Sequence, residues 1–365
     1  MPQSGAVPQR STKRALVAVS HAIEQAALAT AEDGPLLVVA LFQRLPYFER
    51  ERARYARIAG TAAVTVIGMV GQLPADLPPN VVGVPLDEAE ELGREWSVVA
   101  LTPRFGAALV AYDQGEVEPA PTLEAGRLFD GGWSFRRDVA LHEALRLRDR
   151  LGDRVPGPAR AAFDAVLERV RDLPATPGES RAEAALRLMA GRADRAHRAM
   201  AEPVEERPPL LDEPALRRWT LADGVTASGT LPVAVIGVRV AEPAGTPERF
   251  GRRSMARETQ AVVAALTAVL RPVDRAVRLT EQDYLLVLPS LTEEQAVAVA
   301  GRVHESIGGL ARSYPFVAYA VHAAVALTDR RPLPVAEVRH AMEWAAREGV
   351  PVATVAREAV ATGPG

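Results

Sequence analysis

The chain has 365 residues, a formal net charge of −3 and no cysteine. This length accommodates two domains with a connector, and the missing cysteines exclude disulfides, thiolate zinc sites and cysteine nucleophiles. Lys13 is the only lysine, and the arginines are scattered among acidic residues rather than clustered. Nucleic-acid binding is therefore disfavoured. The six histidines lack metal-ligand spacing such as H-x-x-x-H, so no metal site and no cofactor are expected.

The apolar runs are too short to cross a bilayer. The longest, residues 61–71 and 317–327, have the length of buried strands. The first five residues lack the charged and then apolar pattern of a secretion signal. We therefore expect a cytoplasmic protein that is not associated with a membrane.

The first part of the chain is predicted to be an α/β domain of residues 12–152, after a disordered tail of residues 1–11. Leu16, Val19 and Ile23 lie at helical spacing in a helix over residues 11–30. Alternating strands and helices follow, as is typical of an α/β fold. The strands are expected at 36–42, 63–69, 81–84, 96–101 and 107–112, and the helices at 47–58 and 136–151.

A helical connector is predicted over residues 153–214. One helix has an apolar stripe that includes Phe163 and Leu167, and a second is expected to begin with a capping box at Ser180 and Glu183. The second helix has a seam at alternating four- and three-residue steps, which suits pairing with another helix. Pairing within the chain and a homodimer both remain open. The seam consists of Ala182, Leu186, Met189, Ala193, Ala196 and Met200.

The last part, residues 215–358, has the order β-α-β-β-α-β with an added α-β unit and precedes a tail of residues 359–365. The strands are expected at 232–240, 277–279, 284–288, 316–327 and 350–355. One helix is expected to end at residue 270, and two further helices are expected at 292–307 and 335–348.

Within this part, residues 271–289 read RPVDRAVRLTEQDYLLVLP. The stretch resembles the GGDEF domain of diguanylate cyclases, where R-x-x-D is followed by five residues, by G-G-D-E-F and by an apolar strand. The resemblance covers roughly residues 228–356 and implies a mostly antiparallel central sheet flanked by helices. None of the five signature places holds the family residue. They hold Thr280, Glu281, Gln282, Asp283 and Tyr284.

These departures affect the chemistry that the family performs. The paired glycines let the backbone approach GTP, and the acidic residues bind the metal that activates the 3′-hydroxyl. The family also has a metal-binding aspartate at the end of the first strand, whereas residues 235–240 contain no acid. A Pro/Gly loop at 242–247 replaces the phosphate-binding loop. The resemblance therefore implies a pseudoenzyme without catalytic residues.

Arg271 and Asp274 keep the R-x-x-D spacing, five residues before the signature places. In the family this pair forms the inhibitory site that binds cyclic di-GMP, and bidentate arginine geometry suits that role. An Arg and an Asp three residues apart can also form a local ion pair or cap. Both interpretations stay open.

The N-terminal part resembles the DICT sensory domain over roughly residues 12–150. This resemblance implies signal input and does not name the signal. The strings that carry it are LFQRLPYF at 41–48, RYARIA at 54–59, EW at 95–96, AYD at 111–113 and FDGGWSF at 129–135.

A sensory pocket is predicted near the end of the strand at 36–42, where aromatic and arginine side chains gather. Ligand sites in open α/β sheets lie beyond the carboxyl ends of strands, and such residues suit a flat or anionic ligand. Core packing and solvated arginines are the alternative. The candidates are Phe42, Arg44, Tyr47, Tyr55, Arg57, Trp96 and Trp133.

Two functional hypotheses follow. The first is a non-catalytic bacterial signalling receptor, in which the cyclase-like domain binds cyclic di-GMP or a related nucleotide through Arg271 and Asp274. The second is an interaction scaffold whose cyclase-like domain binds no nucleotide and contacts a protein partner. Solvent-facing Arg271 and Asp274 would favour the receptor, and a pair tied together would favour the scaffold.

Overall fold

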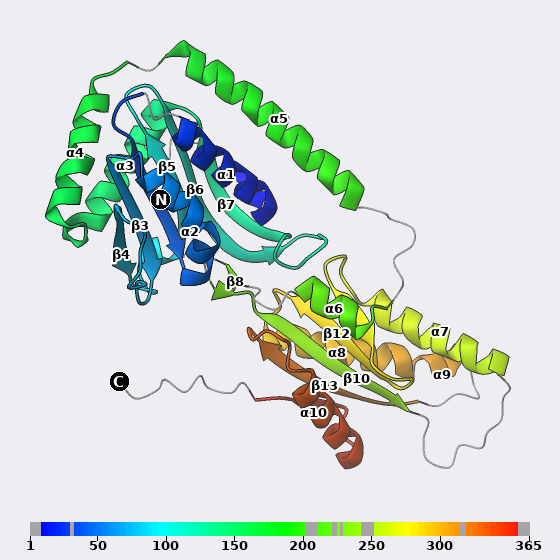
Figure 1. Cartoon of the computed structure of the whole chain (residues 1–365). Coiled ribbons are helices and arrows are strands. Elements are labelled where there is room, and N and C mark those ends of the chain that lie inside the picture. The colour runs from blue at the N-terminus through cyan, green and yellow to red at the C-terminus, as the bar shows by residue number, and fades with distance from the viewer. Residues whose placement is uncertain are drawn as a thin grey trace. The chain divides into compact units, whose positions relative to one another are not determined.

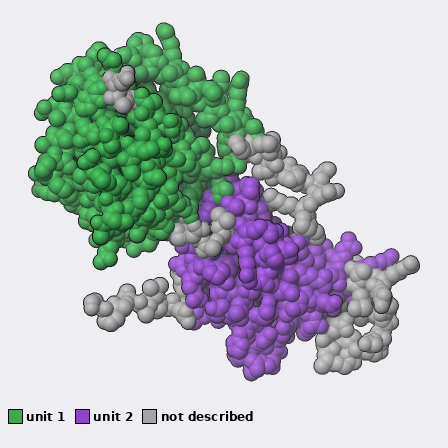
Figure 2. Space-filling view, in the orientation of Figure 1, with its two compact units in different colours: residues 1–114, 125–201, 225–229 green, residues 115–124, 202–224, 230–365 purple. Residues whose placement is uncertain are grey.

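The computed structural model describes residues 9–29, 33–174, 176–201, 210–220, 225–226, 229–241, 252–313 and 319–356. The chain divides into two compact units (Figures 1 and 2). The N-terminal unit contains Met1–Gln114, Ala125–Ala201 and Val225–Gly229. The C-terminal unit contains Gly115–Glu124, Glu202–Gly224 and Thr230–Gly365.

The N-terminal unit is built on a seven-stranded mixed sheet in the order β1-β7-β6-β5-β2-β3-β4. Strands β2, β3 and β4 are parallel neighbours, while β5 pairs antiparallel with β2 and β6, and β1 pairs antiparallel with β7. The strands are β1 (Gln9–Thr12), β2 (Leu37–Gln43), β3 (Val64–Val70), β4 (Val81–Leu86), β5 (Glu95–Leu101), β6 (Gly106–Val117) and β7 (Arg127–Ser134).

Helices cover both faces of this sheet because β2 is apolar on both sides. Val38 and Ala40 contribute to one core, with Ile23 of α1 (Lys13–Ala29) and residues of α2 (Leu45–Ala59). Leu37 and Val39 contribute to a second core, with residues of α3 (Arg137–Leu151) and α4 (Gly157–Arg171). The predicted α/β class is confirmed. Short 3-10 turns occupy Glu91–Arg94 and Gly152–Arg154.

Two parts of this unit differ from the sequence-based prediction. Residues 9–11, expected in a disordered tail, belong to β1, in which Gln9 pairs with Gly131. Helix α4, expected in the connector, buries its stripe against the sheet, with Phe163 and Leu167 in the second core. That stripe covers apolar side chains of β2 and β3 that would otherwise face water.

Helix α5 (Pro177–Ala201) is attached to the N-terminal unit through polar side chains. The Glu179 carboxylate accepts from the Arg137 amide at 2.8 Å, and the Glu183 carboxylate accepts from the Ser134 hydroxyl and from the Phe135 amide. The helix begins three residues before Ser180, so the predicted capping box is wrong, and Glu183 bonds to β7 and its end instead.

The apolar seam predicted on α5 lies largely in solvent. Leu186 is 37% exposed and Met189 is 65% exposed. The seam is therefore not buried by other helices of the described chain at these positions.

The C-terminal unit has a five-stranded sheet in the order β11-β12-β10-β13-β14. All pairs are antiparallel except β13 with β14, so the predicted mostly antiparallel sheet is confirmed. The strands are β10 (Val233–Ala241), β11 (Arg275–Arg278), β12 (Asp283–Pro289), β13 (Ala320–Thr328) and β14 (Val352–Thr354), and β8 (Val225–Thr226) and β9 (Gly229–Thr230) form a separate short pair.

Helices flank this sheet on both faces, as predicted. Ile236 of β10 packs in a core with residues of α7 (Arg252–Ala268) and α8 (Glu293–Gly308). Val235 points the other way, into a core with Leu216 of α6 (Glu213–Thr220) and Met342 of α10 (Val335–Glu348). Helix α9 (Leu310–Ser313) follows α8. None of the described helices is long and apolar enough to cross a membrane. The loop 242–247 and the tail 359–365 lie outside the described residues.

Candidate functional site

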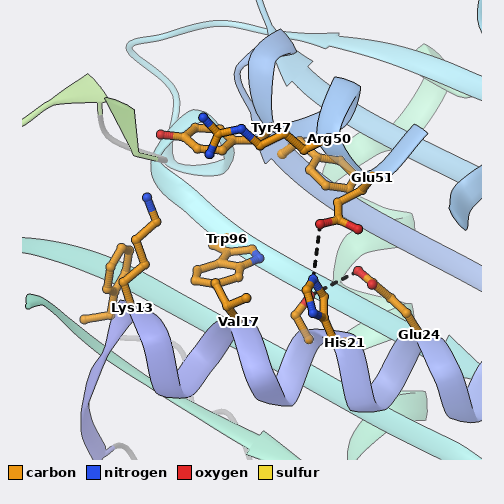
Figure 3. A pocket seen from close by; sticks show the side chains of 11 residues that line it. Lys13, Val17, His21, Glu24, Tyr47, Arg50, Glu51 and Trp96 are labelled. Carbon is orange, nitrogen blue, oxygen red and sulfur yellow. Dashed lines mark hydrogen bonds and ion pairs between the residues drawn. The ribbon is translucent and has the colours of Figure 1, made fainter. Parts of the chain in front are cut away.

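A cavity of about 170 Å³ lies in the N-terminal unit among α1, α2 and one face of the sheet (Figure 3). We call it the α1–α2 cavity. It is lined by Lys13, Val17, Ser20, His21 and Glu24 of α1, by Tyr47, Arg50 and Glu51 of α2, and by Phe42, Trp96 and Phe129 of the strands.

The α1 residues reach the cavity because of their spacing. Lys13, Val17, Ser20 and Glu24 are three or four positions apart, which places them on one face of a helix. The same face buries Leu16 in the core, so the helix is held against the sheet while its polar residues line the cavity.

Three of the predicted pocket residues meet in the α1–α2 cavity: Phe42, Tyr47 and Trp96. The ring of Trp96 meets that of Phe129 edge to face, with centroids 5.7 Å apart. The Lys13 ammonium lies 5.1 Å from the centroid of the Tyr47 ring. Aromatic walls and a cationic group therefore occur in one cavity, although the cation Lys13 is not one of the predicted arginines.

The other four predicted pocket residues lie elsewhere. The Arg44 guanidinium pairs with Glu88 at 2.5 Å, and Arg57 is exposed on α2. Tyr55 is fully buried in the core beside Phe42, and Trp133 lies under the Arg187 guanidinium, 4.5 Å from its ring centroid. Tyr55 and Arg57 lie on faces of α2 that do not line the cavity, Arg44 precedes α2, and Trp133 lies on β7.

One end of the cavity is a buried network around Glu24. Its carboxylate accepts from the Ser20 and Tyr55 hydroxyls at 3.1 Å each, and from Arg54 at 2.5 Å. Burial raises the pKa of Glu24, while the bonds from Arg54 and Tyr55 oppose this effect. Burial and the neighbouring Glu24 carboxylate also raise the pKa of Tyr55 well above its usual value.

His21, Glu24 and Glu51 form a cluster whose potential ligand atoms lie within 4.8 Å of one another. The Arg54 guanidinium contacts both carboxylates, and His21 Nε2 lies 3.1 Å from Glu51 Oε1 (Figure 3). The single Arg54 guanidinium bridges two carboxylates and offsets part of their negative charge. In this structure the three residues form an ion-pair network with Arg54.

The sequence analysis missed the polar half of the cavity, namely Lys13, His21, Glu24, Arg50 and Glu51. His21 lines the cavity. A signal was present in the helix, because Ser20 and Glu24 occupy positions four and eight residues after the buried Leu16. Polar residues on the apolar face of a helix indicate buried partners or a site.

In the C-terminal unit, the five signature places form a tight hairpin turn. The Thr280 hydroxyl accepts from the amides of Gln282 and Asp283, and the Leu279 amide donates to the Asp283 carbonyl at 2.9 Å. Glu281 and Gln282 are exposed, whereas the Tyr284 ring is buried in the core of the unit. Burial raises the pKa of Tyr284.

Asp283 forms a bidentate ion pair with Arg239. The two residues are directly opposite in the β10–β12 pairing, and the nitrogen–oxygen distances are 2.7 Å and 3.0 Å. The Asp283 side chain is only 6% exposed, and its hydrogen bond raises the pKa of Arg239. Both oxygens of this buried carboxylate are therefore occupied by a guanidinium.

Arg271 and Asp274 are tied to one another. The Asp274 carboxylate, 2% exposed, accepts from the Arg271 amide at 2.7 Å and from its guanidinium at 2.8 Å. Arg271 also donates to the Pro289 carbonyl at 2.6 Å. The geometry is that of a local cap and ion pair, and neither residue lines the α1–α2 cavity.

Comparison with known families identifies the first of the two regions. Residues 1–114 match the DICT family. This family is described as a sensory domain in diguanylate cyclases and two-component systems. The DICT match confirms the resemblance of the N-terminal part up to residue 114, whereas the string at 129–135 lies outside it. It contains all the α1–α2 lining residues except Phe129. No curated protein matches this sequence.

Several solved GGDEF structures are similar to the C-terminal region. The active GGEEF domain of a diguanylate cyclase from Vibrio cholerae is 14% identical with a TM-score of 0.31, over 35% of this chain and 85% of that one. The GGDEF domain of DgcB from Caulobacter crescentus, in complex with c-di-GMP, is 16% identical with a TM-score of 0.33, over 42% and 96%. Diguanylate cyclase SiaD from Pseudomonas aeruginosa, in complex with its activator SiaC, is 19% identical with a TM-score of 0.36, over 60% and 88%.

Proposed function

We propose that the chain is a non-catalytic bacterial signalling protein, in which DICT sensory input controls a C-terminal cyclase-like unit. The observation that carries the proposal is the Arg239–Asp283 pair. Divalent cations such as Mg²⁺ require carboxylate oxygens, and both oxygens of Asp283 are bonded to Arg239. A guanidinium at this place also repels a divalent cation.

The signature turn supports the same proposal. Where the cyclase family has two glycines that leave room for GTP, this chain has Thr280 and Glu281, and Thr280 closes the turn through its own hydroxyl. Metal-assisted attack by a 3′-hydroxyl would need a different set of ligands.

The test is a synthesis assay with the full chain. Purified protein would be incubated with GTP and either Mg²⁺ or Mn²⁺, and cyclic di-GMP would be measured by chromatography beside an active cyclase. We expect no product. Metal-dependent product from the wild-type chain would refute the proposal, and its loss in Asp283→Asn but not in the exposed control Arg347→Ala would assign the activity to the signature turn.

For the output, the geometry favours the scaffold over the receptor. Asp274 has no exposed carboxylate oxygen to offer to a guanine edge, since Arg271 uses it as a cap. We therefore infer that the C-terminal unit transmits the signal by contact with a protein partner. The expected cytoplasmic location stays a prediction.

A calorimetric titration with cyclic di-GMP separates these two outputs. We expect no saturable heat with the wild-type chain or with Arg271→Ala. Micromolar binding of cyclic di-GMP that is lost in Arg271→Ala, and kept in Arg347→Ala, would support the receptor interpretation and contradict the scaffold interpretation.

A further inference from the structure

The α1–α2 cavity has the size of a single ring. Its volume is about 170 Å³, and a protein cavity of about 150 Å³ holds one benzene molecule. A ring with one small substituent therefore fits, whereas a cyclic dinucleotide is far too large for it.

Aromatic side chains form the walls of the cavity. Trp96 on β5 and Phe129 on β7 line it from the sheet, and Tyr47 lines it from α2. Aromatic rings gain from edge-to-face or offset contacts, as already made between Trp96 and Phe129. A planar aromatic ligand would add a third ring to this pair.

The formal charges in the lining balance one another. Lys13 and Arg50 contribute two positive charges, and Glu24 and Glu51 contribute two negative charges. Lys13 and Arg50 also interact with other residues of the chain. The lining therefore selects neither an anion nor a cation, and a neutral ligand avoids the cost of removing a charge from water.

Glu51 offers a hydrogen-bond acceptor at the polar end of the cavity. Its Oε1 lies 3.1 Å from His21 Nε2 and its Oε2 accepts from Arg54, so each oxygen has one partner among the described residues. A carboxylate oxygen can accept two hydrogen bonds, which leaves room for a donor from a ligand. The Glu51 side chain is 22% exposed, and Figure 3 shows it pointing from α2 towards His21 on α1.

Glu24 is already occupied on both oxygens. Its Oε1 accepts from the Ser20 and Tyr55 hydroxyls, its Oε2 accepts from Arg54, and its side chain is only 1% exposed. A hydrogen-bond donor on a ligand would therefore meet Glu51 and not Glu24.

We propose that the α1–α2 cavity binds a neutral single-ring phenol. The ring lies among Trp96, Phe129 and Tyr47, and the hydroxyl donates to the Glu51 carboxylate. This inference rests on the sensory role in the proposed function and adds the chemical class of the signal.

Calorimetry on the full chain would use three probes of similar size. Phenol has the ring and the donor, toluene has a methyl group in place of the hydroxyl, and benzoate has the ring with a negative charge. We expect saturable binding of phenol and of toluene, and binding of benzoate at least about tenfold weaker than that of phenol, since benzoate loses the hydration of its charge. No binding of phenol, or benzoate bound as tightly as phenol, would overturn the proposal.

Glu51→Met tests the hydrogen bond. This change removes the acceptor and keeps a side chain of similar length, so phenol should bind about tenfold more weakly while toluene binds as before. Glu49→Met makes the same change at an exposed position of α2 outside the lining, and it should alter neither affinity. An unchanged phenol affinity in folded Glu51→Met protein would contradict the proposed contact.

Val17→Phe tests the place of binding. Val17 lines the cavity from α1, so a phenyl ring at this position should fill the space and abolish the binding of phenol and toluene. Ala18→Phe is the matched control, because Ala18 is the next residue of α1, is exposed and lies outside the lining. Phenol binding that persists in folded Val17→Phe protein would assign the binding elsewhere and overturn the proposal.

Thermal unfolding of each variant would show that the fold is intact. The outcome is separable from the GTP assay: absent phenol binding with absent synthesis refutes only the ligand class. Phenol binding with active synthesis refutes only the non-catalytic assignment.

Discussion

Glu24 and Asp283 are buried carboxylates that depend on arginines at the edge of the fold. The side chain of Glu24 is 1% exposed and that of Asp283 is 6% exposed, while Arg54 and Arg239 are about one quarter exposed. Removing one partner of a buried pair is costly, because the remaining charge cannot be hydrated. These two positions should therefore be sensitive to substitution in ways that surface ion pairs are not.

The first prediction concerns the pKa of Glu24. Tyr55→Phe removes a hydrogen bond that lowers this pKa, so the pKa should rise further above 4.5. Fold stability should fall by about 1–2 kcal/mol at pH 7. Carboxyl carbon NMR over a pH series would measure the pKa, and urea unfolding the stability.

The sign of the pH effect follows from the raised pKa. Because the folded protein binds this proton more tightly than the unfolded chain, protonated Glu24 stabilises the fold at low pH. That contribution is lost as the pH rises through the folded pKa. A Glu24 pKa that falls in Tyr55→Phe would contradict the network described here. The control is His142→Gln, because His142 is exposed. Phe48→Tyr is unsuitable as a control, because Phe48 is buried.

The second prediction concerns the Arg239–Asp283 pair. Arg239→Ala should lower the free energy of unfolding by about 1–3 kcal/mol, since it leaves a buried carboxylate without its bidentate donor. The double variant Arg239→Ala/Asp283→Ala should cost less than the sum of the two single changes. Arg278→Ala on the neighbouring β11, exposed, should change stability by under about 0.5 kcal/mol. If the losses in free energy of unfolding of the two single variants add up to that of the double variant, the interaction between Arg239 and Asp283 contributes nothing to stability.

At the scale of elements, apolar periodicity predicted most helices and strands, because burial decides them. The run of apolar residues in β2 and the stripe on α4 were both visible in the sequence. The sequence did not show which other element each helix packs against or each strand pairs with. The four polar residues of β1 have no pattern of their own, and their pairing with β7 depends on a strand over a hundred residues away.

Helix α5 is the clearest case of a correct pattern with an unknown partner. Its Glu179 and Glu183 bond to the N-terminal unit, and Leu186, Met189 and Ala193 of the predicted seam line a groove beside α1. Leu186 and Met189 lie beside α1 and are still exposed, so pairing within the chain and a homodimer both remain open.

The third prediction tests this homodimer. Met189→Glu should convert a dimer to a monomer, because a carboxylate in a helix seam would lose its hydration on pairing. Leu188→Glu is the matched control, since Leu188 is 53% exposed and lies off the seam. Light scattering coupled to gel filtration would give the masses. A wild-type chain with the mass of a monomer would contradict the homodimer.

At the scale of the whole molecule, each unit has two cores, one on either face of its own sheet. This layering was predictable, since both β2 and β10 are apolar on both sides. The polar lining of the α1–α2 cavity was not, because Lys13 and His21 of α1 and Glu51 of α2 come from two helices whose faces are fixed only by packing. Nearness in the sequence predicted Phe42, Tyr47 and Arg44 as pocket residues, and of these three only Phe42 and Tyr47 line the cavity.

The fourth prediction concerns the two units. Phe163→Ala should destabilise the N-terminal unit by about 3–5 kcal/mol, and Leu266→Ala the C-terminal unit by about 2–5 kcal/mol, since both side chains are fully buried. Calorimetric unfolding should show two transitions, of which each variant shifts one. A single transition that moves in both variants would show that the chain unfolds as one unit.

The cross-strand position of Arg239 has a consequence for protein engineering. Arg239→Asp would set two carboxylates directly opposite each other on β10 and β12, where like charges repel. The melting temperature of this variant should be lower than that of the wild type and should rise with added Mg²⁺ or Mn²⁺, because a bound cation relieves the repulsion. Thermal unfolding with and without the cation would test this. The melting temperature of the variant would then report the presence of divalent ions.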